Sequence, residues 1–534
     1  MQGRVLLLGE CWNSPGFLHV CTPKQHIVSI AQTRSGKGVS LIIPNLLNYQ
    51  GSVLVVDPKA ENAWVTAAYR RDVLGQKTFI VDPWNVINRD YASLAGGEEL
   101  QESIAKFNPL SILDPGSDDF VEDLAYLADA LIITESAREP YFDNTARELW
   151  AGLMAYVVEN PAFRDHRSLE AARKLLMQPN EELARTIEMA IDLGPGSIAA
   201  LKLAQFKNVK DSTSIMSVIS AARTQTAFLD TATLNRAMES SDFNFEELCG
   251  GGTSIYLVLP PDKFKTYARW LRLMVSIAIR AVARRSAQGR TGLPTLFVLD
   301  EFGTIGKLNA VAQAYGLMAG LGMIMWSFSQ DLNQLKRDYP EDWETFIANS
   351  QAITCFGVMD NFTADYISKF LGTQTIQHQN VSTTHDAVSS LVTSTTRSTQ
   401  TTSRPLLHPD EVRRLDSDHC LLMGKLQPIY SRRIVYHEDW DLLHRARSDP
   451  HFPRTENVRW QALSRRLLEM RSVGRLLTEY GFDVKAGWFG RWKVKSTDGK
   501  WAHTFANDND LWRWTYMLAM DGTGAAQALL SGGA

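Results

Sequence analysis

The sequence has few cysteines and no long apolar run. Its 534 residues include five cysteines, which are scattered along the chain and form no Cys-x-x-Cys pair. This spacing argues against structural zinc and against a disulfide framework, and it indicates a reducing compartment. No stretch reaches the roughly 18 consecutive apolar residues that a membrane-spanning helix needs, and no signal peptide is visible. We therefore expect a cytoplasmic chain.

The sequence also lacks a strong net charge. It has 55 Lys and Arg against 59 Asp and Glu, a net charge of −4 at pH 7. The chain as a whole therefore shows no nucleic-acid signature, and any DNA binding must be local. An apolar content of 45% and a charged content of 21% are typical of a soluble globular protein. The length exceeds what one hydrophobic core supports, so we expect several domains.

One stretch combines the signals of a phosphate-binding loop. Residues 27–30 predict a buried strand, small residues with Gly36 and Lys37 follow, and residues 39–47 predict a helix. Backbone N–H groups of such a loop and the positive end of its helix converge on an anion. Lys37 would add a charge for the β- and γ-phosphates.

The loop departs from the general pattern Gly-x-x-x-x-Gly-Lys-[Ser/Thr] at both ends. Ala31 replaces the first glycine, and Gly38 replaces the final hydroxyl residue. Without that hydroxyl the usual direct Mg²⁺ ligand is lost, so water, Thr33 or Ser40 would have to take its place. A strand–turn–helix in which Gly36 only permits a tight turn is the alternative for this stretch taken alone.

A second candidate element lies far downstream. Residues 294–299 predict a buried strand, and Asp300 and Glu301 follow it directly. Two acids at the end of a buried strand are costly unless they hold a metal or water. Asp300 would hold Mg²⁺ through water, and Glu301 would polarise the attacking water. The alternative, two acids that cap a strand at the surface, is weakened by the phosphate-loop candidate in the same chain, and together the two elements predict a nucleotide site for ATP and Mg²⁺.

Gln330 is a third candidate for the same site. It ends the apolar strand predicted over residues 322–329. An amide just beyond a strand next to the acidic pair fits a sensor of the γ-phosphate. A polar residue that merely starts a helix is the alternative.

Strands that alternate with helices predict an α/β fold with a mostly parallel sheet. Strands are predicted over residues 51–57 and 78–82, with a crossover helix over 62–71 between them. Polar residues gather at the carboxyl ends of the strands, the edge at which such sheets bind ligands.

We expect four segments along the chain. Residues 1–115 form the first part of a nucleotide-binding domain, and residues 246–455 form its second part. Residues 116–245 have helical periodicity without a catalytic cluster, and we interpret them as an all-α domain inserted between the two parts. Residues 456–534 form a Trp-rich C-terminal α+β module of unknown role.

Two further stretches have unusual compositions. Residues 381–403 contain 14 Ser or Thr among 23 residues, and this low apolar content predicts a mobile loop. The tail holds six of the 14 tryptophans. Residues 493–501 predict a hairpin with an Asp-Gly turn, and residues 509–520 predict a helix. The basic and aromatic residues of the tail could stack on single-stranded nucleic acid, or the tryptophans form the core or a partner surface of a small module.

The ordered motifs of the chain resemble those of TraG-type conjugative coupling proteins, the ATPases of type IV secretion systems. The resemblance covers roughly residues 20 to 440. It is carried by Thr33-Arg34-Ser35-Gly36-Lys37-Gly38-Val39, Ile43-Pro44-Asn45-Leu46-Leu47, Gly51-Ser52-Val53, Asp57-Pro58-Lys59, Phe107-Asn108-Pro109-Leu110, Leu299-Asp300-Glu301-Phe302-Gly303, Gln330-Asp331-Leu332-Asn333-Gln334-Leu335 and Arg404-Pro405-Leu406-Leu407.

The resemblance implies a RecA-like P-loop NTPase domain, an inserted all-α domain, and a homo-oligomer, a hexameric ring around a DNA channel. It implies that the loop from Thr33 to Val39 binds ATP, and it is consistent with catalytic roles for Lys37, Glu301 and Gln330 and with Mg²⁺ held by Asp300 through water. The implied partners are a relaxase bound to single-stranded DNA or secreted effectors, together with components of the type IV secretion channel. The implied location is the cytoplasmic face of the bacterial inner membrane. Family members usually begin with transmembrane helices, so membrane association is expected through helices missing from this sequence or through a partner protein.

Two other functions stay open. A double-stranded DNA-pumping hexameric ATPase would use a similar ring, although the all-α insertion and the tail favour cargo recruitment. A non-hydrolysing cargo receptor would keep the ring without the chemistry, although Lys37, Asp300 and Glu301 argue against an inactive site. No position identifies itself as an arginine finger.

Overall fold

A computed structural model describes residues 3–449 with gaps at 12–16, 92–96, 134–139, 208–212, 288–291, 386–391 and 426. In the C-terminal part it describes residues 477–478, 481–486, 491–497, 502–506, 510–511 and 514. Among these residues no helix is both long enough and apolar enough to cross a bilayer.

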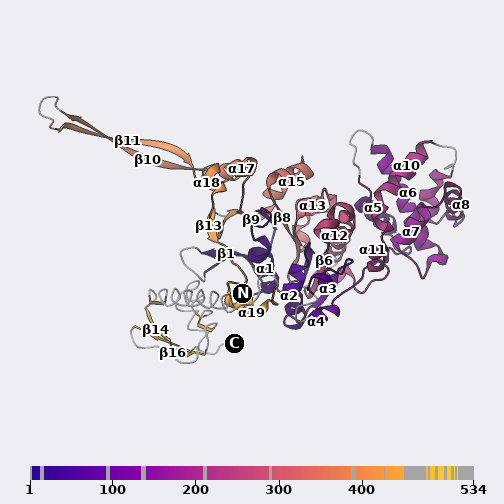
Figure 1. Ribbon diagram of the computed structural model, residues 1–534, viewed down its shortest axis with the longest axis horizontal. Coiled ribbons are helices and arrows are strands. Elements are labelled where there is room, and N and C mark those ends of the chain that lie inside the picture. The colour runs from indigo at the N-terminus through magenta and orange to yellow at the C-terminus, as the bar shows by residue number, and fades with distance from the viewer. Residues whose placement is uncertain are drawn as a thin grey trace.

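An 11-stranded sheet forms the centre of the molecule (Figure 1), with the strand order β2-β1-β13-β12-β9-β3-β8-β7-β4-β6-β5. The seven strands from β9 to β5 are parallel, and the strands from β2 to β12 are antiparallel. The prediction of an α/β fold with a mostly parallel sheet is confirmed. The strands are β1 (Leu6–Cys11), β2 (Leu18–Cys21), β3 (His26–Ala31), β4 (Val53–Asp57), β5 (Lys77–Val81), β6 (Thr253–Val258), β7 (Thr295–Leu299), β8 (Met323–Ser329), β9 (Ser350–Phe356), β12 (His419–Gly424) and β13 (Ile429–Arg432).

Helices cover both faces of the parallel strands, and the strand sequences reflect this. Every residue of β3, β4, β6, β7 and β8 is buried, as expected where both faces of a parallel sheet are covered. Side chains alternate between two cores along β4: Val53 and Val55 pack with α1 (Ile43–Asn48) and α2 (Glu61–Asp72), while Leu54 and Val56 pack with α12 (Phe264–Ala287). The remaining helices around the sheet are α3 (Val86–Tyr91), α4 (Gly97–Gln101), α13 (Phe302–Ile305), α14 (Asn309–Leu317), α15 (Leu332–Asp338), α16 (Trp343–Ala348), α17 (Asn361–Leu371), α18 (Pro409–Arg413) and α19 (Trp440–Arg445).

A helical insertion separates β5 from β6 in the sequence and lies to one side of the sheet (Figure 1). Its central helix α6 buries Leu149, Trp150, Leu153 and Met154 completely. The predicted helical insertion is confirmed, and its boundaries at 116 and 245 stay predictions. Its helices are α5 (Phe120–Leu131), α6 (Pro140–Glu159), α7 (Leu169–Leu176), α8 (Asn180–Ile191), α9 (Ile198–Leu203), α10 (Thr213–Gln225) and α11 (Ala232–Ala237).

The described part of the Ser/Thr-rich stretch forms a long antiparallel ribbon, so the predicted loop is wrong for residues 381–385 and 392–403, while residues 386–391 lie outside the described residues. Strands β10 (Thr373–His385) and β11 (Val392–Pro405) pair from Thr373 opposite Pro405 to His385 opposite Val392, and the ribbon projects from the body in Figure 1. Threonine is β-branched and favours strands. The ladder hydrogen bonds satisfy the backbone, so low apolar content does not exclude strands here.

The C-terminal part contains a small antiparallel sheet of β14 (Phe482–Ala486), β15 (Trp492–Ser496) and β16 (Ala502–Phe505). Pairing of β15 with β16 confirms the predicted hairpin, and its turn lies outside the described residues. Most of the helix predicted over residues 509–520 also lies outside them, although positions 510, 511 and 514 are helical.

Candidate functional site

The loop after β3 has the backbone conformation of an anion cradle. A π-helical turn over Gly38–Ile42 continues into α1, and Lys37 stands at its start. Gly36 has a φ of 87°, a left-handed conformation that favours glycine. Ser35 closes the loop with a hydrogen bond from its Oγ to the Gln32 carbonyl at 2.6 Å. The first N–H groups of a helix have no carbonyl partner within it, so those of residues 37–39 are available to an anion.

The two hydroxyl residues suggested as replacement Mg²⁺ ligands differ in their surroundings. Ser40 Oγ donates to the Gly36 carbonyl at 2.7 Å, within its own helical turn. Thr33 lies exposed in the loop. The Ser40 hydroxyl is therefore already engaged, whereas the Thr33 side chain is open to solvent.

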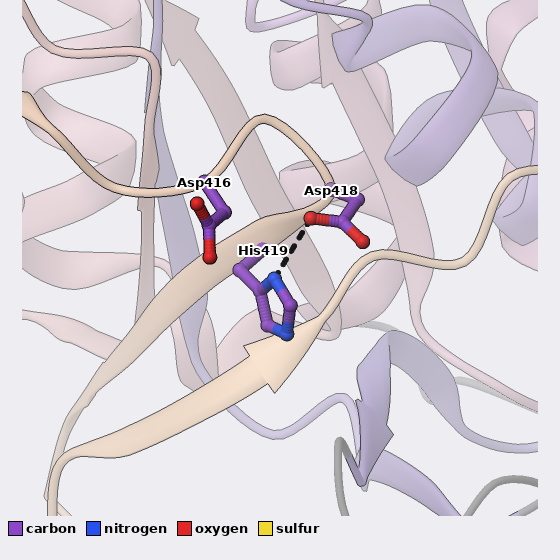
Figure 2. A group of neighbouring side chains, drawn as sticks. All are labelled: Asp416, Asp418 and His419. Atoms are coloured by element: carbon purple, nitrogen blue, oxygen red, sulfur yellow. Dashed lines mark hydrogen bonds and ion pairs between the residues drawn. The ribbon is translucent and has the colours of Figure 1, made fainter.

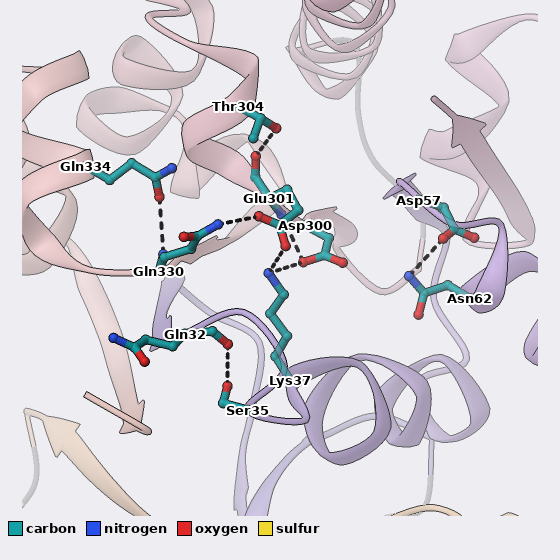
Figure 3. Close-up of polar contacts among 10 residues, drawn as sticks. All are labelled: Gln32, Ser35, Lys37, Asp57, Asn62, Asp300, Glu301, Thr304, Gln330 and Gln334. Carbon is teal, nitrogen blue, oxygen red and sulfur yellow. Dashed lines mark hydrogen bonds and ion pairs between the residues drawn. The ribbon is translucent and has the colours of Figure 1, made fainter. Parts of the chain in front are cut away.

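Lys37 and the two acids lie together at one edge of the sheet (Figure 3). The Lys37 Nζ is 3.1 Å from Asp300 Oδ1 and 2.5 Å from Glu301 Oε1. Gln330 Nε2 donates to Glu301 Oε2 at 3.0 Å. Strand β8 lies between β3 and β7 in the sheet, so the carboxyl ends of three adjacent parallel strands bring the predicted catalytic side chains into one cluster.

Glu301 has a strained backbone. Its φ of 51° and ψ of 43° are left-handed, a conformation that costs about 1–3 kcal/mol in a residue with a side chain. Its N–H donates to Asp300 Oδ1 at 2.9 Å, and its carbonyl accepts from Thr304 Oγ1 at 2.6 Å. Such strain concentrates at functional sites because surrounding structure must hold it.

Gly303 leaves room for the Gln334 side chain, which contacts Gln330. A Cβ at Gly303 would lie 1.9 Å from Cδ of Gln334, which is far inside contact distance. The Gln334 Oε1 in turn accepts from the Gln330 N–H at 3.2 Å. In the sequence, Gly303 and Gln334 stand out only as members of motifs, and nothing there indicates that the two are in contact.

Burial and the charges of the neighbouring groups shift the pKa values of Lys37, Asp300 and Glu301. Burial lowers the pKa of the Lys37 ammonium, but Asp300 and Glu301 outweigh burial and raise its pKa overall. Burial raises the pKa of Asp300 even with Lys37 beside it. Burial also acts to raise the pKa of Glu301, but the charge and hydrogen bond of Lys37 outweigh it and lower that pKa. The pKa shifts of the two acids are therefore opposite in direction, upward for Asp300 and downward for Glu301.

Asp57 is a buried acid for which the sequence predicted no role. It ends β4, next to β7 in the sheet, and accepts hydrogen bonds from the Ala63 N–H at 2.7 Å and from Asn62 Nδ2 at 3.3 Å. Burial raises its pKa to about 7, and the nearby charge of Asp300 acts in the same direction. The sequence feature that could have identified Asp57 is its position at the carboxyl end of a predicted buried strand.

Arg433, which follows β13, contacts the loop after β3. Its Nη1 donates to the Ser35 carbonyl, and its guanidinium lies 4.8 Å over the Phe356 ring. A Cβ at Gly36 would lie 3.2 Å from that nitrogen. Arg433 follows β13, almost 400 positions after the loop, and nothing in the sequence links the two.

A second group of polar side chains lies at the start of β12 (Figure 2). Asp416, Asp418 and His419 each offer one ligand atom within 4.8 Å of the others. The His419 Nδ1 is 2.9 Å from Asp418 Oδ1, its ring stacks on Tyr430 at 4.6 Å, and the Tyr430 hydroxyl donates to Asp416 Oδ2 at 3.4 Å. These mutual contacts account for the arrangement, and we assign the group a structural role in the β12–β13 pair.

Comparison with protein families and curated proteins gives one consistent result. A model of the family described as "Type IV secretory system Conjugative DNA transfer" matches residues 3–467. The chain is 27% identical over 411 residues to the conjugal transfer protein TraG of Escherichia coli, covering 73% of this chain and 62% of that protein. It is 28% identical over 432 residues to the protein VirD4 of Rhizobium rhizogenes, covering 78% of this chain and 59% of that protein. The chain thus spans about three fifths of the length of these relatives.

Comparison with solved structures shows a shared fold. The unbound bacterial conjugative coupling protein TrwBdeltaN70 superposes with a TM-score of 0.57 at 15% identity, covering 77% of this chain and 85% of that chain. The plasmid coupling protein TrwB in complex with ADP and Mg²⁺ superposes with a TM-score of 0.55 at 14% identity, covering 77% and 86%. At these identities the likeness supports the architecture alone.

Proposed function

The chain belongs to the type IV secretory family of conjugative DNA-transfer proteins, and from this premise we propose that it is a coupling ATPase. It recruits relaxase-bound single-stranded DNA or secreted effectors and delivers them to the type IV secretion channel. The observation that carries the proposal is the contact of Lys37 with Asp300 and Glu301 at the sheet edge.

The residues at this edge fit a nucleoside triphosphate with Mg²⁺. The loop from Thr33 to Val39 supplies helix N–H groups and a left-handed Gly36, and Lys37 supplies a positive charge in a site of low dielectric. Asp300 would hold Mg²⁺ through water, and the bound ion would neutralise charge on the β- and γ-phosphates. The plasmid coupling protein TrwB, which shares the fold, has been solved in complex with ADP and Mg²⁺.

Hydrolysis would depend on Glu301 and Gln330. The lowered pKa of Glu301 keeps its carboxylate ready to accept a proton from the attacking water. The hydrogen bond from Gln330 to Glu301 orients that carboxylate and couples it to the γ-phosphate that Gln330 would sense. Bound phosphates would compete with the two acids for the Lys37 ammonium. This division of roles among Lys37, Glu301 and Gln330 argues against a non-hydrolysing receptor.

The assembly follows from the same proposal. The chain would form a homo-oligomer, a hexameric ring at the cytoplasmic face of the bacterial inner membrane. It would attach there through transmembrane helices or through a separate membrane protein. A neighbouring subunit of the ring would supply an arginine finger.

Substitution of Glu301 tests the proposal. We expect Glu301→Gln to lower ATP hydrolysis by at least about 100-fold, since a positioned general base contributes that much or more. Nucleotide binding should persist because Lys37 and the loop are unchanged. The measurements are phosphate release and titration with a fluorescent ATP analogue. The matched control is Glu341→Gln at an exposed position before α16, which should hydrolyse ATP normally. Undiminished turnover in Glu301→Gln would contradict the assignment.

A further inference from the structure

The sheet of β14, β15 and β16 has one apolar face and one basic face. The apolar face contributes Phe482, Val494 and Phe505 to a core that also contains Leu477, Leu511 and Trp514. The side chains that alternate with these are all exposed. They form what we call the lysine face, which consists of Asp483, Lys485, Lys493, Lys495, Ala502 and Thr504.

The lysines of this face are not neutralised within the sheet. Lys485 lies directly opposite Lys493 in the β14–β15 register, and like charges in that position are unfavourable. Within the described residues, no ion pair joins Lys485, Lys493 or Lys495 to an acid. The only acid of the face among the described residues is Asp483, opposite Lys495. Such an arrangement suits a ligand that carries several negative charges.

The aromatic side chains among the described residues of the module point away from this face. Trp514 makes an edge contact with Phe482 at a centroid distance of 5.0 Å and a tilted contact with Phe505 at 5.5 Å. Trp492 is partly buried and packs against the same core. Single-stranded nucleic acid is bound largely by stacking of bases on exposed aromatic rings, and the described lysine face offers none. The interpretation of these tryptophans as module core is therefore favoured over stacking.

We propose that the lysine face binds double-stranded DNA through its phosphates. Strands in a sheet are about 4.8 Å apart, so three strands span about 10 Å and match a major groove about 12 Å wide better than a minor groove about 6 Å wide. Sheets that bind duplex DNA in this way are known among DNA-binding proteins. An anionic membrane is a poorer match, since binding at a membrane surface usually also buries apolar side chains, and this face presents only Ala502 and Thr504 beside its charged residues.

This binding is independent of the nucleotide site. It would tether the chain to duplex DNA without ATP, and it would persist if the proposed ATPase function were wrong. The experiment is therefore done on the full chain without nucleotide.

The test is the salt dependence of binding to a short fluorescent duplex, measured by anisotropy between about 50 and about 200 mM salt. In Lys485→Gln/Lys493→Gln/Lys495→Gln, we expect binding at low salt to weaken by about 10-fold or more. The slope of log affinity against log salt should fall by about 2 to 3, since each lost phosphate contact removes about 0.9. The variant Lys485→Arg/Lys493→Arg/Lys495→Arg keeps the three positive charges and should bind the duplex like the original chain.

A charge-matched control separates this face from general electrostatics. Lys24→Gln/Lys207→Gln/Lys265→Gln removes three exposed lysines elsewhere in the chain and should leave the slope nearly unchanged. If hydrogen exchange shows that the first triple disturbs β14–β16, Lys493→Gln alone should still lower the slope by about 1. An unchanged slope in the lysine-face variants would overturn the proposal. So would variants that lose binding to anionic vesicles while duplex binding stays intact.

Discussion

The sheet edge that carries Lys37 and the C-terminal module place lysine in opposite environments. Lys37 is 8% exposed and lies between two carboxylates. Lys493 is exposed and faces another lysine. In the first region each charge is compensated at short range in low dielectric, so chemistry and stability depend on the same contacts. In the second the charges are solvated, cost little stability, and would act on the proposed DNA ligand through a field that salt screens.

The largest expected effect is on stability, from removal of the buried lysine. Lys37→Ala leaves Asp300 and Glu301 buried without a cation, and we expect a loss of about 3 to 5 kcal/mol in the free energy of unfolding at neutral pH. The loss should shrink at acidic pH, because protonation then neutralises the acids. Urea denaturation at several pH values measures it. Lys493→Ala in the exposed region should cost less than about 0.5 kcal/mol, and equal losses in the two variants would break the comparison.

The second prediction concerns the pH dependence of stability, which we expect from the buried Asp57 and not from an exposed acid. Burial raises the pKa of Asp57 from 3.8 to about 7, so its protonated form is favoured in the folded chain. Its contribution to stability is complete below its unfolded pKa and is lost as pH rises through about 7. We expect the original chain to lose about 2 to 4 kcal/mol relative to Asp57→Asn between about pH 4 and pH 8. Denaturant unfolding checks this, and Asp365→Asn, at an exposed position, should give parallel pH curves. If the difference in the free energy of unfolding between the original chain and Asp57→Asn does not change with pH, the burial of Asp57 does not control its charge.

The smallest expected effect concerns the lysine face itself. Lys485→Gln removes a like-charge pair with Lys493 and should stabilise the module by about 0.2–1 kcal/mol. Lys495→Gln is its matched control, because it loses an opposite charge across from Asp483 and should be neutral or slightly destabilising. Hydrogen exchange of the β14–β16 amides measures both. Equal shifts in the two variants would show that the cross-strand register does not determine the energetics of this face.

Local sequence patterns were sufficient to predict much of the sheet edge that carries Lys37, Asp300 and Glu301. The apolar run before Gly36 and the run before Asp300 each predicted a buried strand, and the structure has β3 and β7 there. Their meeting followed from a general property of parallel sheets, in which the carboxyl ends of the strands share one edge. The functional roles of Lys37, Glu301 and Gln330 stay predictions.

Composition was a poor guide where burial does not decide the structure. Residues 381–403 predicted a mobile loop because they are polar, yet they lie largely in β10 and β11. Backbone pairing and the strand preference of threonine do not depend on an apolar face. In the tail, the sequence left open whether the tryptophans form the core of the module or contact a ligand. The alternation of residues along a strand does not tell which face is buried until the strand register is known.

The sequence by itself determined the α/β class, the helical insertion, and the positions of the loop at Lys37 and of the acidic pair at the ends of buried strands. These depend on interactions between near neighbours in the chain, which leave periodic and ordered motifs. Only the tertiary structure decided that Arg433 contacts Ser35, that Gly303 makes room for Gln334, and that three lysines share one face. Such contacts join distant segments through strand order and close packing, and neither leaves a local signal in the chain.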